Sequence, residues 1–370
     1  MALAAKWKNM RASTRKKLLM LGGMLVVFAI LQLLLSLDLL SNQIQSWLVP
    51  CCYNIILAVS LNLTVGILGE LSLGHAGFMC VGAFVGAFVS KYFDTVNPDL
   101  SAWIRLPLAL VLGGIVAGLF GLIVGVPVLR LNGDYLAIVT LAFGEIIWNL
   151  FNVTRVSLDN GSFRVGVGGT GLSNLSADAV PLVDGSLGIT SVPRLGKGGF
   201  AIAFVLAFLT VLLVMNLIHS RTGRAIKAIR DNRIAAESIG INITKYKLIA
   251  LVVSAFLAGI AGVLYAHNAG QAVATQADYG YVMSINILVF VVLGGMGSTL
   301  GSMIAAVVLT ILPEWLRFLS DYRMLIYAVV LIGMMLVNGS PAIKAVVDRG
   351  RQVVKQKIKN LFIRQPKKEA

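Results

Sequence analysis

Long apolar blocks recur along the chain, and they limit what it can fold into. The blocks at 18–37, 201–218, 248–266 and 324–337 contain no charged residue. A helix rises about 1.5 Å per residue, so the longer blocks match the roughly 30 Å hydrocarbon core of a bilayer. Charged residues make up 13% of the chain, which is about half of their usual share in soluble domains. We therefore predict an all-α, polytopic membrane protein.

Basic residues cluster at the ends of the predicted spans. Of the 31 Lys and Arg residues, six precede Leu18, seven lie in 221–247 and nine follow Ser340. A positive excess in short loops marks the cytoplasmic side of a membrane. The basic N-terminus (1–17) and the basic tail (341–370) are therefore both predicted to be cytoplasmic.

The remaining topology follows from this placement of the termini. A single transmembrane domain is predicted over 18–340. Segment 153–198 then lies outside, as an ordered loop with a short helix or hairpin, and segment 219–243 lies inside. About ten spans are expected, near 18–38, 46–66, 74–92, 105–127, 134–152, 199–218, 244–266, 282–294, 299–316 and 323–338.

The net charge of +15 does not indicate a nucleic-acid-binding protein. Such binding needs an exposed basic face with base-reading groups, and no hydrophilic segment is long enough to fold one. The charge is a topology signal, with a weaker attraction to anionic membrane lipid.

Two glycine-rich stretches interrupt helical character at membrane depth. They are GILGELSLGHAG (66–77, the first helix break) and LGGMGSTLGS (293–302, the second helix break). Irregular backbone is tolerated there only when it is buried in protein or lines a wet cavity. Paired interruptions of this kind point to a translocation route and to an inverted repeat. Glycines at GxxxG spacing, which predict close helix contacts, are Gly82 and Gly86, Gly114 and Gly118, and Gly121 and Gly125.

Several ionisable residues fall within predicted spans, where their cost implies a role. Glu70 and His75 flank the first helix break; they either line or brace a pathway, or hydrogen-bond backbone groups freed by the break. Glu145 lies deep in its span, either as a pathway group or as a polar clamp between helices. His267, at the end of a span, is expected at the membrane interface. Pathway or helix-break roles are also predicted for Gly294, Gly295 and Gly297.

No enzymatic or metal chemistry is predicted. A phosphate-binding loop needs a lysine after its glycines, and no lysine lies between Lys247 and Lys344. An intramembrane serine protease is disfavoured because GxSG is absent and no Ser/His pair has an obvious shared depth in the predicted spans. The three cysteines fall in apolar spans without CxxC spacing. We therefore expect no catalytic residues, no metal and no cofactor.

The inside segment 219–243 alternates apolar and charged residues as an amphipathic helix does. Gly240 is expected to end the helical stretch, and Thr244 is expected to cap the next span. A charged helix between two spans is suited to transmitting movement from a partner. The alternative is a helix that lies on the lipid surface.

The stretches that carry these features resemble the permeases of branched-chain amino-acid ABC importers. The resemblance covers about 45–340 and is greatest for the M-type (LivM-like) subunit. Ser302 departs from it, because many members have a proline there. The stretches are NLTVGILGELSLGHAGFMCVGAF (62–84), LNGDYLAIVTLAFGEII (131–147), GRAIKAIRDNRIAAESIGINITKYKLIALVVSAFLAGIAGVLYAH (223–267), LVFVVLGGMGSTLGSMIAA (288–306) and LPEWLR (312–317).

This resemblance implies a permease subunit in a bacterial inner membrane, with ATP hydrolysis in separate chains. The implied partners are a second, H-type permease, two ABC ATPase subunits and a periplasmic binding protein that docks on outer loops including 153–198. Segment 219–243 would be the coupling segment that contacts the ATPase. Its contact residues are expected to be Arg224, Arg230, Asp231, Glu237 and Gly240.

The implied cargo is a small zwitterionic or neutral solute, with leucine, isoleucine and valine as the first expectation. Closely similar permeases carry urea or short amides, which is the first alternative. An ATP-independent secondary transporter is the second alternative, although the intramembrane ion pairs that it predicts are scarce here.

Overall fold

The computed structural model describes residues 12–97, 102–129, 131, 133–159, 162–168, 179–196 and 198–316, with isolated positions between 322 and 333. The chain divides into two compact units, 1–311 and 312–370. Within the described residues, eight helices are long and apolar enough to cross a membrane. The predicted polytopic all-α membrane fold is therefore confirmed, although the predicted span 323–338 lies largely outside the described residues.

The membrane-crossing helices follow the predicted spans closely. The last of them pairs a one-turn helix, α11, with α12, and the shorter apolar helix α13 follows. Their bounds are α2 (Ala12–Ser36), α3 (Asn42–Asn62), α4 (His75–Val96), α5 (Ala102–Val128), α6 (Asp134–Val153), α7 (Gly199–His219), α10 (Ile243–Ala269), α11 (Gln276–Tyr279), α12 (Tyr281–Gly294) and α13 (Thr299–Trp315).

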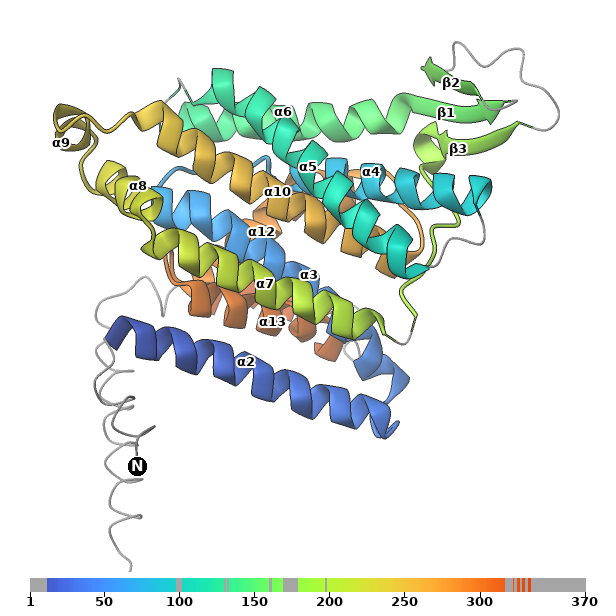
Figure 1. The fold of residues 1–370 in the computed structure, drawn as a ribbon, viewed down its shortest axis with the longest axis horizontal. Coiled ribbons are helices and arrows are strands. Elements are labelled where there is room, and N and C mark those ends of the chain that lie inside the picture. The colour runs from blue at the N-terminus through green and yellow to red at the C-terminus, as the bar shows by residue number, and fades with distance from the viewer. Residues whose placement is uncertain are drawn as a thin grey trace, which may run out of the picture. The chain divides into compact units, whose positions relative to one another are not determined.

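Helices α3, α4, α5 and α10 form the packed centre, and α2 lies at its periphery (Figure 1). Ile56 and Leu57 of α3 are fully buried. A Cβ on Gly82 of α4 would overlap the backbone of Gly259 of α10, so these helices pack backbone to backbone. This confirms the close contact predicted from glycine spacing. The exposed face of α2 is apolar, as expected for a helix against lipid.

Both predicted helix interruptions are confirmed. Helix α3 continues as a π-helical turn, Leu63–Leu68, which ends at Gly69 with a left-handed φ of +82°. The backbone is then irregular until α4 starts at His75. At the second break, α12 ends at Gly294 and the chain turns through left-handed glycines before α13 begins. The inverted repeat remains a prediction.

Two structures of different kinds lie at opposite ends of the helices (Figure 1). One end carries a three-stranded antiparallel sheet, ordered β2-β1-β3, that contains the predicted hairpin. The other end carries the short helices of segment 219–243. The bounds are β1 (Thr154–Asp159), β2 (Ser162–Val167), β3 (Val180–Asp184), α8 (Arg221–Asp231) and α9 (Arg233–Ser238).

Local side chains begin and end the helices of segment 219–243. Ser220 caps α8, and the Asn232 side chain accepts from the amide of Ala235 to cap α9. Gly240 leaves α9 with φ +83°, as predicted. The prediction that Thr244 caps α10 is wrong. Asn242 does so, because its short side chain reaches the free amide of Lys245 at 3.0 Å.

Candidate functional site at the junction of the helix breaks

The two helix breaks meet in space although they are far apart in sequence. The side-chain oxygen of Asn62, Oδ1, accepts a hydrogen bond of 2.9 Å from the amide of Gly297. A Cβ on Gly66 would overlap both that oxygen and the amide nitrogen of Gly297. Only glycine at position 66 therefore allows the backbones to approach this closely. We call Asn62, Gly66 and Gly297 the break junction.

Arg230, at the end of α8, reaches the break junction. Its Nη1 donates to the carbonyl oxygen of Gly66 at 3.1 Å. Its stem packs against Gly69, where a Cβ would lie 2.8 Å from the Arg230 Cγ. Asp231 Oδ1 accepts from Nε and Nη2 of the same guanidinium, at 3.2 and 3.1 Å. The arginine predicted to contact a partner therefore points toward the first helix break, and its side chain is 41% exposed.

A second basic residue holds the irregular part of the first break. Lys247, in the second turn of α10, forms an ion pair with Glu70 Oε1. The side chains are 4% and 19% exposed, respectively. The other Glu70 oxygen is buried, with no hydrogen-bond partner in the described part of the chain. Glu70 thus anchors the break to α10, and its own amide donates to the Thr64 carbonyl at 3.1 Å.

His75 begins α4 and is buried. Its Nε2 is 2.9 Å from the hydroxyl of Ser60 in α3. Near it, the hydroxyls of Thr140 and Ser284 accept from the amides of Leu73 and Ala76 at 3.1 Å each. Side chains of α6 and α12 therefore supply the partners for amides freed by the break, while His75 braces α4 against α3.

Glu145 links α6 to the start of α12. It accepts from the indole nitrogen of Trp148 at 2.7 Å and from the amide of Tyr281 at 2.8 Å. A carboxylate at a helix start also favours the helix dipole. The sequence allowed two roles for Glu145, a pathway group or a polar clamp, and these contacts have the geometry of the polar clamp.

Replacing Glu145 with leucine is expected to lower stability by about 1–3 kcal/mol, because two donors lose a charged acceptor. Glu145→Gln keeps one oxygen acceptor and should lose less than half as much. Thermal unfolding of the purified chain in detergent measures both variants. Equal unfolding temperatures for wild type and Glu145→Leu would exclude the clamp.

The glycines of the second break make a tight turn. A Cβ on Gly294 would overlap the backbone of Gly301 and Ser302, which lie in the first turn of α13. Gly295 and Gly297 have φ values of +90° and +83°, where other residues are strained. The predicted helix-break role therefore has a steric basis at all three glycines.

The other predicted coupling residues lie at the surface of the α8–α9 end. Arg224 donates to the His219 carbonyl at 3.1 Å. Asp231 and Glu237 are exposed. Two large apolar side chains that belong to the predicted amphipathic pattern, Ile234 and Ile239, are 81% and 74% exposed. Apolar residues surrounded by charges are typical of a protein interface.

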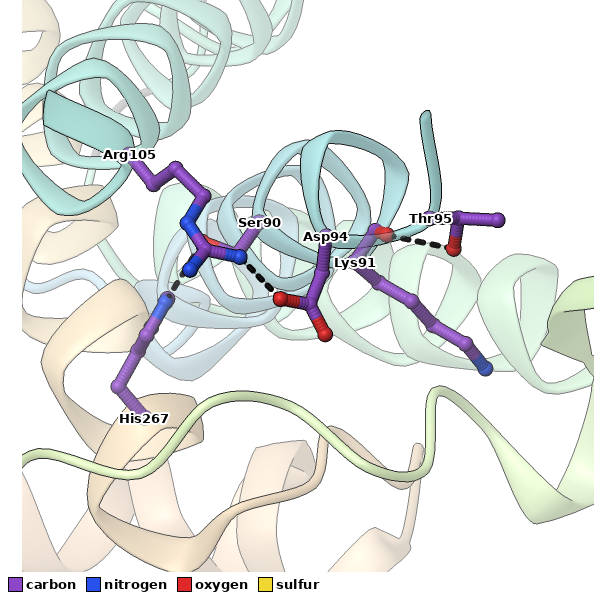
Figure 2. A network of polar contacts seen from close by, with 6 residues as sticks. All are labelled: Ser90, Lys91, Asp94, Thr95, Arg105 and His267. Carbon is purple, nitrogen blue, oxygen red and sulfur yellow. Dashed lines mark hydrogen bonds and ion pairs between the residues drawn. The ribbon is translucent and has the colours of Figure 1, made fainter. Parts of the chain in front are cut away.

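A separate polar cluster lies at the sheet end of the helices. Figure 2 shows Arg105 beside Asp94, with which it pairs, and His267 bonded to Ser90 at 2.8 Å. His267 lies in the last turn of α10, at the end of a span as predicted, and its membrane-interface placement stays a prediction. Its side chain is buried, and the chain near Leu195 crosses over this end of α10 and donates an amide to the His267 carbonyl at 3.1 Å.

The fold and this junction define a multi-pass membrane protein with two interrupted helices tied to an amphipathic surface segment. Residues 43–337 match the family described as branched-chain amino acid transport system / permease component. The chain belongs to this family, and the resemblance seen in the sequence is confirmed.

Three individual relatives share between 25% and 34% of their residues with this chain. LivM of Salmonella typhimurium, a high-affinity branched-chain amino acid transport system permease protein, is 34% identical over 303 residues, covering 76% of this chain. This chain spans about 65% of the length of that LivM. The fructose import permease protein FruG of Bifidobacterium longum is 26% identical, covering 80% of this chain and 84% of FruG. LivH of Salmonella typhimurium is 25% identical, and the match covers 69% of this chain and 78% of LivH. No solved structure matches.

Proposed function

We propose that this chain is the M-type permease subunit of an ABC importer for branched-chain amino acids. The observation that carries the proposal is the α8–α9 surface, where Ile234 and Ile239 are exposed in the same segment as the exposed charges of Asp231 and Glu237. The same segment contacts the first helix break through Arg230, whose Nη1 donates to the Gly66 carbonyl, and that carbonyl lies against Gly297 of the second break. A partner seated on this surface could therefore act on the parts of the membrane domain that interrupt its helices.

The proposed cargo is supported by the relatives and by the chemistry of the spans. The relative with the highest identity above is named for branched-chain amino acids. Buried charge in the described spans is paired, as in Lys247 with Glu70, which suits a solute without net charge. FruG, a relative with 26% identity, is named for fructose import, so the cargo needs a direct test.

The proposed orientation places α8–α9 and both termini in the cytoplasm, in accordance with their basic residues. Two ATPase subunits would bind at this side. A second, H-type permease would complete the membrane domain. Supporting this, LivM and LivH are both relatives of this chain, and each is named as a permease protein of a high-affinity branched-chain amino acid transport system. A substrate-binding protein would dock on the opposite side, near the β1–β3 sheet.

The test is reconstituted transport. An affinity tag on this chain isolates its complex from native membranes, and the complex is placed in liposomes with ATP inside or outside. We expect uptake of labelled leucine that needs ATP on the α8–α9 side and a loaded binding protein. Uptake without nucleotide would disprove the importer, and uptake of urea or fructose in place of leucine would disprove the cargo.

Glu237→Arg is expected to uncouple transport, because it reverses a charge on the surface proposed to contact the ATPase. Leucine uptake should fall by about tenfold or more, as for loss of a close charge pair, with the protein still inserted. Glu237→Gln, which removes the charge without reversing it, should lose less. The readouts are uptake and ATP hydrolysis in the same liposomes, and unchanged uptake in Glu237→Arg would remove this surface from the proposal.

A further inference from the structure

We propose that Arg230 is the positioning residue through which movement of α8 reaches both helix breaks at once. This inference rests on the proposed function of segment 219–243 as the coupling segment. Arg230 would not serve as an ATPase contact. It would instead transmit movement inward, through the Gly66 carbonyl, to a junction that includes residues of both breaks.

The guanidinium is held in one orientation by its surroundings. Asp231 accepts from two of its nitrogens, Nε and Nη2, and thereby directs Nη1 toward the Gly66 carbonyl. The stem lies against Gly69, whose missing side chain leaves room for it. A planar group with several fixed donors can bind an acid and a carbonyl at the same time, which a lysine ammonium does less well.

A movement of Gly66 would also reach the second break, because Gly66 and Gly297 cannot separate without losing contacts. Gly297 donates its amide to Asn62, one helical turn before Gly66. A Cβ on Gly297 would lie 3.1 Å from the Gly66 carbonyl oxygen and 3.7 Å from the Arg230 Nη1. The carbonyl that accepts from Arg230 therefore also lies against the turn of the second break.

The rest of α8 packs against the first break, so a movement of this helix would move the break with it. Ile226 and Ile229 are buried on the inner face of this helix, which contacts the π-helical turn Leu63–Leu68. Arg224, on the same helix, bonds instead to the His219 carbonyl. It is a matched control, since its replacement removes a similar charge and hydrogen bond without touching either break.

Hydrogen exchange on the full chain in lipid nanodiscs tests the contact without transport. In Arg230→Gln, we expect peptides covering 63–70 and 293–302 both to exchange about tenfold faster, as for loss of a hydrogen bond to a charged donor. Arg230→Lys should restore part of the protection. Arg224→Gln should leave both peptides at wild-type rates.

Asp231→Asn provides a second variant should Arg230→Gln not fold, because it keeps the arginine and removes the acceptor that orients it. It should raise exchange at the same two peptides by a smaller factor. Faster exchange at 63–70 alone, or at neither peptide, in the variants that fold would overturn the proposal, since the second break would then not be coupled to Arg230.

The same variants in the reconstituted complex test the consequence. Arg230→Gln should consume more ATP than wild type for each leucine imported, while the ATPase subunits remain bound. Loss of the ATPase subunits from the complex would overturn the proposal and make Arg230 a docking residue. Failure of wild type to use ATP would instead disprove the proposed function, and the exchange result would stand on its own.

Discussion

Lys247→Met is expected to destabilise the chain by about 3 kcal/mol, because it leaves the Glu70 carboxylate in a buried position without its partner. Methionine keeps the length and the apolar stem of lysine, so that packing changes little. Glu70 would then have to take up a proton or pull the break toward solvent. Thermal unfolding of the purified chain in detergent, or denaturant unfolding, measures the loss.

The double variant Glu70→Gln/Lys247→Met should recover more than half of this loss, because a neutral amide needs no counter-charge. Lys245→Met is the matched control. Lys245 lies two residues away on the exposed face of α10, and its loss should change stability by less than about 0.5 kcal/mol. If the two single lysine variants are equally stable, the ion pair does not anchor the break.

Gly262→Ala is expected to reduce the amount of folded protein strongly, although it adds only a methyl group. A Cβ at this position of α10 would overlap the carbonyl oxygen of Met79 in α4, which is backbone and cannot rotate away. The two helices would have to move apart along their contact, at a cost of about 1–3 kcal/mol or more. Size-exclusion chromatography and unfolding temperature together report this loss.

Gly118→Ala is the control for this substitution. It too lies within a membrane-crossing helix, but its Cβ would find its nearest neighbour, Phe256, at an ordinary 3.6 Å. Alanine favours a helix over glycine by about 1 kcal/mol, so this variant should be as stable as wild type or slightly more stable. A Gly262→Ala chain as stable as Gly118→Ala would show that α4 and α10 are less closely packed than described.

The fold was largely predictable because a membrane imposes simple rules. An apolar block of sufficient length must become a helix, and a break such as Gly66–Gly77 must be buried in protein. The positions of both breaks therefore followed from glycine and polar residues alone. The β1–β3 sheet was predicted only as a hairpin or short helix, since no membrane constrains that loop.

The site was predicted less completely, because its contacts depend on which segments meet. An amphipathic pattern assigns Arg230 to a charged surface, whereas its acceptor is the backbone carbonyl of Gly66, which carries no side-chain pattern. Asn62 likewise gave no indication of its role. Lys247 could have been found, since it adjoins the apolar block 248–266 and Glu70 lacked a partner in its own break.

Helices α4 and α10 are fastened to each other near both of their ends. Lys247 holds the segment that leads into α4, and some 20 residues later, about 30 Å along the axis, His267 bonds to Ser90 of α4. Sliding one helix along the other would break both attachments together with the glycine contacts between them. Tilting or rotating as one body would keep all of these contacts, so we expect a movement of one end of this helix pair to be accompanied by a movement of the other end.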